Sequence, residues 1–159
     1  MKAVLFALCC AAISPAAAFA PQRVADERLA AELQQRLAQR AIAICARGGA
    51  HVAVAIAGPD RVVRTLISDD GANVLAIETA RRKAMSAALV GYPTSGLTKG
   101  AREAPVYVEM LRSVEPALLT LGGGVPIRVK GALLGGIGVG GAAGGEGDGG
   151  CARQALLEV

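Results

Sequence analysis

Apolar residues recur at helical spacing in four parts of the chain. Between Asp26 and Arg47, leucines, isoleucines and alanines return every three to four positions, which predicts a long helix that ends at a pair of glycines. A second long helix is predicted from about Asn73 to Val90. A shorter helix fits Arg102 to Arg112, and a last one begins at about Asp148.

Between these helices lie short runs rich in β-branched residues, which favour strands. The turn Gly58–Arg61 has proline at its second position and predicts a hairpin between the two runs that flank it. The expected strands are 51–57, 62–67, a weak candidate at 115–121, 127–130 and the glycine-laced 132–139. Residues 91–100 are predicted to be irregular. Short turns imply antiparallel pairing, so the fold class is α+β, with an antiparallel sheet of about five strands flanked by helices.

The first twenty residues differ from the rest of the chain. Lys2 precedes an apolar run over residues 3–13 and a small-residue segment over 14–20. This order predicts a signal peptide at residues 1–20, cleaved after Ala18 or Ala20. The run is shorter than the ~20 residues of a membrane span, so no stable membrane insertion is expected after cleavage. Residues 21–159 then form a single domain that is periplasmic or secreted.

Composition narrows the choice of partner. The formal net charge is +4, including Lys2, and both phenylalanines lie within the predicted signal peptide. Tyr92 and Tyr107 are the aromatic residues of the remaining sequence, which has no tryptophan. Single-stranded nucleic acid is bound by stacking bases on aromatic side chains. The sequence therefore predicts no nucleic-acid partner.

Three side chains could have either a chemical or a purely structural role. Cys45 and Cys151 form either a disulfide, which an oxidising compartment permits, or two small buried thiols. The single histidine, His51, opens an apolar strand and is either a partly buried structural residue or a ligand. No nucleophile, base and orienting group stand out together, so whether the protein is an enzyme stays open.

A glycine motif at Gly136–Gly141 satisfies the spacing G-x-G-x-x-G. The dinucleotide fingerprint also requires a helix directly after the motif and a further strand, for which the remaining sequence up to Val159 leaves no room. Because Ile137 and Val139 alternate with glycine, the motif instead predicts a strand that another backbone or a ligand approaches closely.

Several segments together resemble the GlcG/HbpS family of heme-degrading and heme-binding domains. They are the A-x-x-K-A helix around Lys83, the segment Tyr92–Ser95, the G-G-V-P-I turn at 123–127 and the glycine motif at 136–141, in that order. The resemblance implies a profilin-like (GlcG-like) fold, heme as cofactor, and assembly into a homo-oligomer. It also implies that Lys83, Thr94 and the backbone amides of Gly123 and Gly124 border the ligand, with His51 or Thr94 as the axial ligand of a heme iron.

The sequence departs from this family at two positions. Ala57-Gly58-Pro59 stands where an aspartate is usual, and Gly140 stands where a serine is usual. The leading hypothesis is an exported protein that binds heme or a related tetrapyrrole. The alternatives are an oxidative heme-degrading enzyme and a cofactor-free accessory protein that binds a small organic acid at 122–126.

Overall fold

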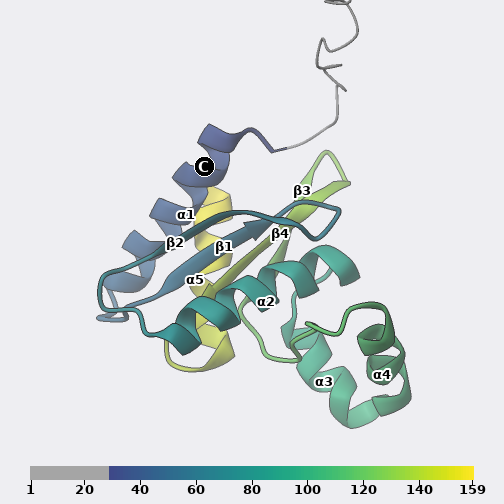
Figure 1. Cartoon of the computed structure of the whole chain (residues 1–159). Helices are drawn as coiled ribbons and strands as arrows, with labels where there is room; N and C mark the ends of the chain where they lie inside the picture. The colour runs from purple at the N-terminus through teal and green to yellow at the C-terminus, as the bar shows by residue number, and fades with distance from the viewer. Residues whose placement is uncertain (1–28) are drawn as a thin grey trace, which may run out of the picture.

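The computed structural model describes residues 29–159, and the predicted signal peptide lies outside this range. One helix, two strands, three helices, two strands and a last helix follow one another along this part of the chain (Figure 1). Their bounds are α1 Ala31–Ala46, β1 Ala53–Ala57, β2 Val63–Ser68, α2 Val74–Val90, α3 Ser95–Glu103, α4 Pro105–Val114, β3 Gly124–Val129, β4 Ala132–Gly140 and α5 Gly144–Glu158. The predicted α+β class is confirmed.

The described strands form a four-stranded sheet in the order β2-β1-β4-β3. Each neighbouring pair is antiparallel: Ala55 faces Leu66 of β2 and Gly138 of β4. The predicted hairpin at 58–61 forms, a second one turns at 130–131, and each contains one non-glycine residue with positive φ, Arg61 and Lys130. The sheet therefore has the expected pairing but four strands, not about five.

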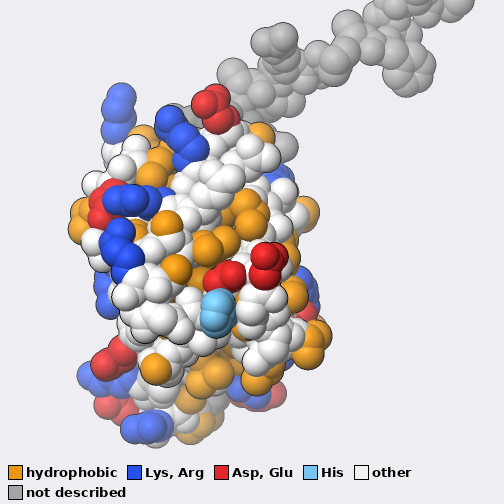
Figure 2. All heavy atoms as spheres, turned by 90° about the vertical axis from the view of Figure 1, so that its left-hand side faces the viewer, with side chains coloured by type: hydrophobic (Ala, Val, Ile, Leu, Met, Phe, Trp, Pro, Cys, Tyr) orange, Lys and Arg blue, Asp and Glu red, His pale blue; other side chains and the backbone are white. Residues whose placement is uncertain are grey.

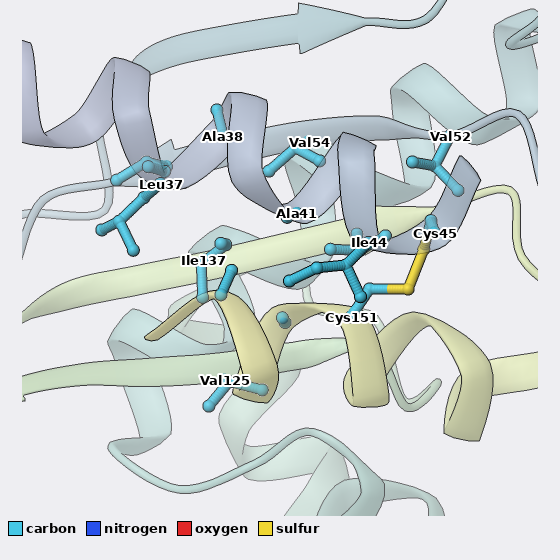
Figure 3. Packing of buried hydrophobic residues seen from close by; sticks show 14 of the residues in the cluster. Leu37, Ala38, Ala41, Ile44, Cys45, Val52, Val54, Val125, Ile137 and Cys151 are labelled. Carbon is cyan, nitrogen blue, oxygen red and sulfur yellow. A yellow bond between two sulfur atoms is a disulfide. The ribbon is translucent and has the colours of Figure 1, made fainter. Parts of the chain in front are cut away.

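One face of the sheet is covered by the first and last helices. Side chains of α1 and α5 pack on the inward residues of three strands, including Val54, Ile137 and Val125 (Figure 3). A disulfide between Cys45 and Cys151 joins the two helices at one end of this layer. This cluster contains most of the large aliphatic residues of the core.

The other face is covered by α2 alone, which lies much closer to the sheet. The cluster on this side consists almost entirely of alanines from α2 and β1. Opposite them, β4 presents glycine: a Cβ at Gly138 would overlap the carbonyl oxygen of Ala80. The glycine motif is thus a packing surface for a helix backbone, as its alternation with Ile137 and Val139 predicts.

A third, smaller cluster holds α3 and α4 together below α2 (Figure 1). Leu97 of α3, Val108 and Leu111 of α4, and Leu118 of the following loop are buried against one another. The helix α3 was not expected, because its sequence SGLTKGARE contains two glycines. It forms because Leu97 is buried and because Thr98 donates a hydrogen bond to the carbonyl oxygen of Thr120. Tertiary contacts here override low helix propensity.

The weak strand candidate at 115–121 is wrong: this segment is an irregular loop. Its backbone groups are bound by side chains of helices instead of by a neighbouring strand. Arg82 donates to the carbonyl oxygen of Ala117, and Ser86 accepts from the amide of Leu119. Because these groups already have partners, the segment needs no strand ladder.

The last helix begins at Gly144, four residues earlier than expected. Its first turn is rich in glycine, a composition that argues against a helix. At Gly145 a side chain would stand 2.7 Å from the Cα of Gly122, so the two backbones pack directly on each other. The position of this turn is therefore fixed by packing that the sequence pattern does not show.

Candidate functional site

A groove runs between α3, the loop before β3, and the first turn of α5. It consists of two cavities of about 480 and 390 Å3 that share Ser95, Gly145 and Glu146 in their walls. The larger cavity extends along α3, and the smaller reaches Gly123 and Gly124. We refer to these two cavities together as the α3–α5 groove.

The walls of the α3–α5 groove combine cationic and apolar groups. Lys99, Arg102 and Arg153 line it, and Leu121 contributes a half-exposed aliphatic side chain. Acidic groups are also present: Glu103 lies 3.7 Å from the Lys99 ammonium. Both groups of that pair are largely exposed, so the lysine is available to another anion at little cost.

Thr94 lies directly behind the groove and is fully buried. Its hydroxyl donates to the carbonyl oxygen of Leu121 at 2.7 Å and accepts from the amide of Gly124 at 2.9 Å. Its own amide donates to the carbonyl oxygen of Gly124 at 2.9 Å. Thr94 thus ties the start of α3 to the start of β3. Of the two predicted ligand-facing amides, that of Gly124 is engaged, while within residues 29–159 the N–H of Gly123 has no hydrogen-bond acceptor.

Lys83 lies beneath Gly123 and is buried. Its ammonium donates to Asp148 Oδ2 at 2.6 Å and to the carbonyl oxygen of Val139 at 3.0 Å. The other carboxylate oxygen of Asp148 accepts from the amide of Ala142 at 2.9 Å. Gly123 has a φ of +118°, and a Cβ there would lie 2.9 Å from the Lys83 ammonium. Lys83 therefore borders the predicted site from below, through its ion pair with Asp148, a partner that sequence reasoning missed.

His51 lies away from these residues. Its imidazole is exposed (Figure 2), and Nδ1 is 2.9 Å from Asp69 Oδ2. This hydrogen bond holds the pKa of the Asp69 carboxyl below its usual range. The ring lies over Gly71, where any Cβ would overlap it. The structure thus brings Lys83, Thr94, Gly123 and Gly124 together and places His51 outside the α3–α5 groove.

The cationic residues of the groove were not predicted as site residues. Lys99 lies in the segment that was expected to be irregular, so its spacing from Arg102 could not indicate that the two side chains share a helix face. On a helix, residues three apart share a face, and the recognition of α3 would have placed both on one surface. Arg153 is one turn beyond Gly149 on α5, and only the contact of α5 with Gly122 and Gly123 brings it to the groove.

No helix in residues 29–159 is long and apolar enough to cross a membrane. No three histidine, cysteine, aspartate or glutamate side chains of the described chain gather as a metal site.

An antiparallel sheet with α2 on one face and α1 and α5 on the other defines an α+β domain of profilin-like fold, with a groove beside its glycine turn. The chain belongs to the HbpS-like family: the model for "Haem degrading protein HbpS-like" matches residues 29–157. No curated protein sequence matches the chain.

Solved structures agree with this assignment. A double mutant of HbpS from Streptomyces reticuli is 32% identical, with a TM-score of 0.78, and the alignment covers 94% of this chain and 99% of that one. A second HbpS structure is 33% identical, with a TM-score of 0.77 and coverage of 90% and 98%. A PduOC–heme complex shares the fold at 23% identity, with a TM-score of 0.73 and coverage of 83% and 95%.

Proposed function

We propose that this protein is exported and binds heme, or a related tetrapyrrole, in the α3–α5 groove. The observation that carries the proposal is that this groove opens at Gly123 and Gly124, beside Thr94 and above Lys83. These are the residues that the resemblance to the HbpS-like family associates with the ligand. A protein of the same fold was solved as the heme complex named above.

The chemistry of the groove suits an amphipathic dicarboxylate. Propionate groups are bound by cationic side chains and free backbone amides, and Lys99, Arg102, Arg153 and the N–H of Gly123 supply both. Leu121 offers an apolar surface to the macrocycle. Heme would supply its own redox chemistry when bound, and the chain would fix its position and exclude water from one face.

Substitution of His51 and of Thr94 tests which of the two is the axial ligand. His51 offers an exposed imidazole but lies outside the groove, and the Thr94 hydroxyl lies behind Gly124 with two hydrogen bonds already made. If the groove is the heme site, His51→Ala leaves both the Soret band position and the affinity unchanged. A Soret shift in H51A alone would make His51 the ligand and move the site, and a shift in T94V alone would assign Thr94.

Export is supported by two features. The first twenty residues have the order of a signal peptide, and Cys45 and Cys151 form a disulfide, a bond that is rare in reducing compartments. Expression of the full chain in bacteria, followed by fractionation and mass determination, tests this. We expect a periplasmic or secreted product that begins after Ala18 or Ala20, and an uncleaved cytoplasmic product would contradict it.

Titration of the purified protein with hemin tests binding. We expect a saturable Soret band at micromolar hemin, weakened several-fold in the charge-reversal variant Lys99→Glu/Arg102→Glu. Arg36→Glu/Arg47→Glu, with one change on α1 and the other directly after its end, alters the net charge equally without touching the groove and should bind like the parent. No Soret band at micromolar hemin would exclude heme, and equal losses in both variants would exclude the groove.

A second candidate function is oxidative heme degradation, which the description of the matched family model favours. Addition of a reductant to the heme complex separates the two functions. Progressive loss of the Soret band that persists with catalase indicates turnover by the protein, whereas a stable band indicates binding alone. If carboxylic acids raise the melting temperature and hemin does not, the ligand is a small organic acid.

We also propose that the protein is a homo-oligomer. The helix α4 exposes Val106, Met110 and Val114, which lie four residues apart on one face. This apolar face could pack against a second copy of the chain. Sedimentation equilibrium tests this, and a monomer at micromolar concentration would contradict it.

A further inference from the structure

The disulfide Cys45–Cys151 lies in the wall of a separate cavity of about 570 Å3. This cavity opens at the end of the sheet where α1 ends and α5 begins. Both cysteines line it, together with Ile44 and a set of glycines and alanines. None of its lining residues carries a charge or a side chain larger than isoleucine, so the cavity admits a small thiol to the edge of the disulfide, whose cysteines are themselves 3% and 9% exposed.

The glycines that open this cavity differ in what the fold demands of them. Gly141 has a φ of +120°, and a Cβ there would overlap the carbonyl oxygen of His51, so glycine is required. Gly147 lies within α5, and a Cβ there would meet only the Cβ of Ala142 at 3.4 Å, an ordinary contact. The packing therefore permits a side chain at 147, and its absence leaves the cavity beside the buried disulfide open.

The same helix carries groups of the candidate ligand site. Gly145 and Glu146 of its first turn line the α3–α5 groove, and Asp148 holds Lys83 beneath Gly123. Cys151 lies one turn after Asp148 and ties α5 to α1. The disulfide and the buried ion pair thus both hold α5 in place. When the disulfide is reduced, only the ion pair of these two contacts still holds the groove wall.

We propose that Cys45–Cys151 is a site of thiol–disulfide exchange, and that its reduction loosens α5 and weakens ligand binding in the α3–α5 groove. The second half rests on the proposed function. The co-reactant is a dithiol, small or carried by a disulfide reductase. Its thiolate attacks one sulfur, the Cys45–Cys151 bond breaks, and the other cysteine leaves as a thiolate that takes up a proton. The second thiol of the reagent then displaces the first cysteine, so two electrons pass to the protein and the dithiol is oxidised to a disulfide.

The rate of reduction by dithiothreitol, followed by thiol labelling and mass spectrometry without any ligand, tests the exchange site. We expect reduction of the folded protein at a rate that low concentrations of urea do not change. Gly147→Leu should slow it several-fold because the side chain fills the cavity. Gly150→Leu, in the same helix but outside the cavity, is the matched control and should react like the parent. A rate that rises with urea as global unfolding does, or that G147L and G150L change equally, would overturn the proposal.

Hemin affinity of the variant Cys45→Ala/Cys151→Ala tests the coupling. We expect binding several-fold weaker than in the disulfide-bonded parent, and by linkage hemin should disfavour reduction by the same factor. Equal affinities in a parent that binds hemin would overturn the coupling. If the parent binds no hemin, the proposed function fails by itself. Hydrogen exchange then decides the structural part: faster exchange of α5 amides in C45A/C151A supports the loosening, and unchanged exchange overturns it.

Discussion

The ion pair between Lys83 and Asp148 lies under the glycine turn at the closed side of the α3–α5 groove. Both side chains are about 95% buried, the Lys83 ammonium donates to two acceptors, and both carboxylate oxygens of Asp148 accept a hydrogen bond. The family resemblance predicts Lys83 beside the ligand, but Asp148, 65 residues away, could not be paired with it. No local pattern records a contact between side chains so distant along the chain.

Removal of one member of this pair should destabilise the fold strongly. Lys83→Met leaves Asp148 buried without its cation, and we expect a loss of about 3–5 kcal/mol in the free energy of unfolding. Urea unfolding measures it. Lys99→Met, at an exposed position, should cost little.

The double variant Lys83→Met/Asp148→Asn tests whether the cost arises from the unpaired charge. It should recover part of the loss, because the amide oxygen of asparagine can still accept from Ala142. A double variant less stable than K83M by the full cost of a second independent loss would contradict this explanation.

The hydrogen bond between His51 and Asp69 should give a pH-dependent contribution to stability. Because the bond lowers the pKa of Asp69 in the folded protein, the contribution is present above the carboxyl's unfolded pKa and is lost as the pH falls through its folded pKa. His51→Ala should raise the pKa of Asp69 toward its usual range, as measured by NMR titration of the carboxyl. Asp60, whose pKa is lowered by a hydrogen bond from Arg64, is the control and should not move.

Among the elements, α2 and β4 are matched in length per structural repeat: one turn of the helix advances about as far as two residues of the strand. Four residues of a helix rise about 6 Å, and two residues of a strand span about 6.6 Å. Alanines at 76, 80 and 84 therefore stack in register on glycines at 140, 138 and 136. This contact was predictable in kind from the alternation of glycine with Ile137 and Val139, although the approaching element was not identified.

A methyl group at the middle of this contact should force the two backbones apart. Gly138→Ala should destabilise the protein by about 1–3 kcal/mol, since the added Cβ overlaps the Ala80 carbonyl oxygen. Gly150→Ala, where no atom lies within 4 Å of the new Cβ, should not destabilise. Thermal unfolding of both variants measures the difference, and equal melting temperatures would contradict the packing described for α2.

Two other elements escaped prediction for a common reason. The helix α3 and the loop at 115–121 are held by each other and by α2: Thr98 and Ser86 bind backbone groups of the loop, and Leu97 is buried beside it. Neither segment has a strong periodic pattern of hydrophobic residues of its own. Since α3 carries Lys99, this is also why half of the groove could not be found from sequence.

For the whole molecule, the disulfide joins the first described helix to the last. It joins residues 106 positions apart, so it restricts the unfolded chain far more than the folded one and thereby stabilises the fold. The spacing of Cys45 and Cys151 left a bridge and two buried thiols equally open, because bridging depends on α1 and α5 covering the same face of the sheet. That arrangement follows from the sheet order and not from local sequence.

The variant Cys45→Ala/Cys151→Ala should lower the free energy of unfolding by about 2–5 kcal/mol. Urea denaturation measures this, and dithiothreitol should lower the stability of the parent but not of the variant. A variant as stable as the parent would mean that the disulfide contributes nothing to the stability of the whole domain.

The central claim, that the α3–α5 groove holds the tetrapyrrole, is tested most directly by the footprint of a diamagnetic analogue. Zinc protoporphyrin added to the isotope-labelled protein should shift the NMR amide signals of residues 95–103, 121–124 and 145–146, while those around His51 and Asp69 stay in place. Shifts centred on His51, or on the disulfide cavity, with the groove signals unmoved would contradict it.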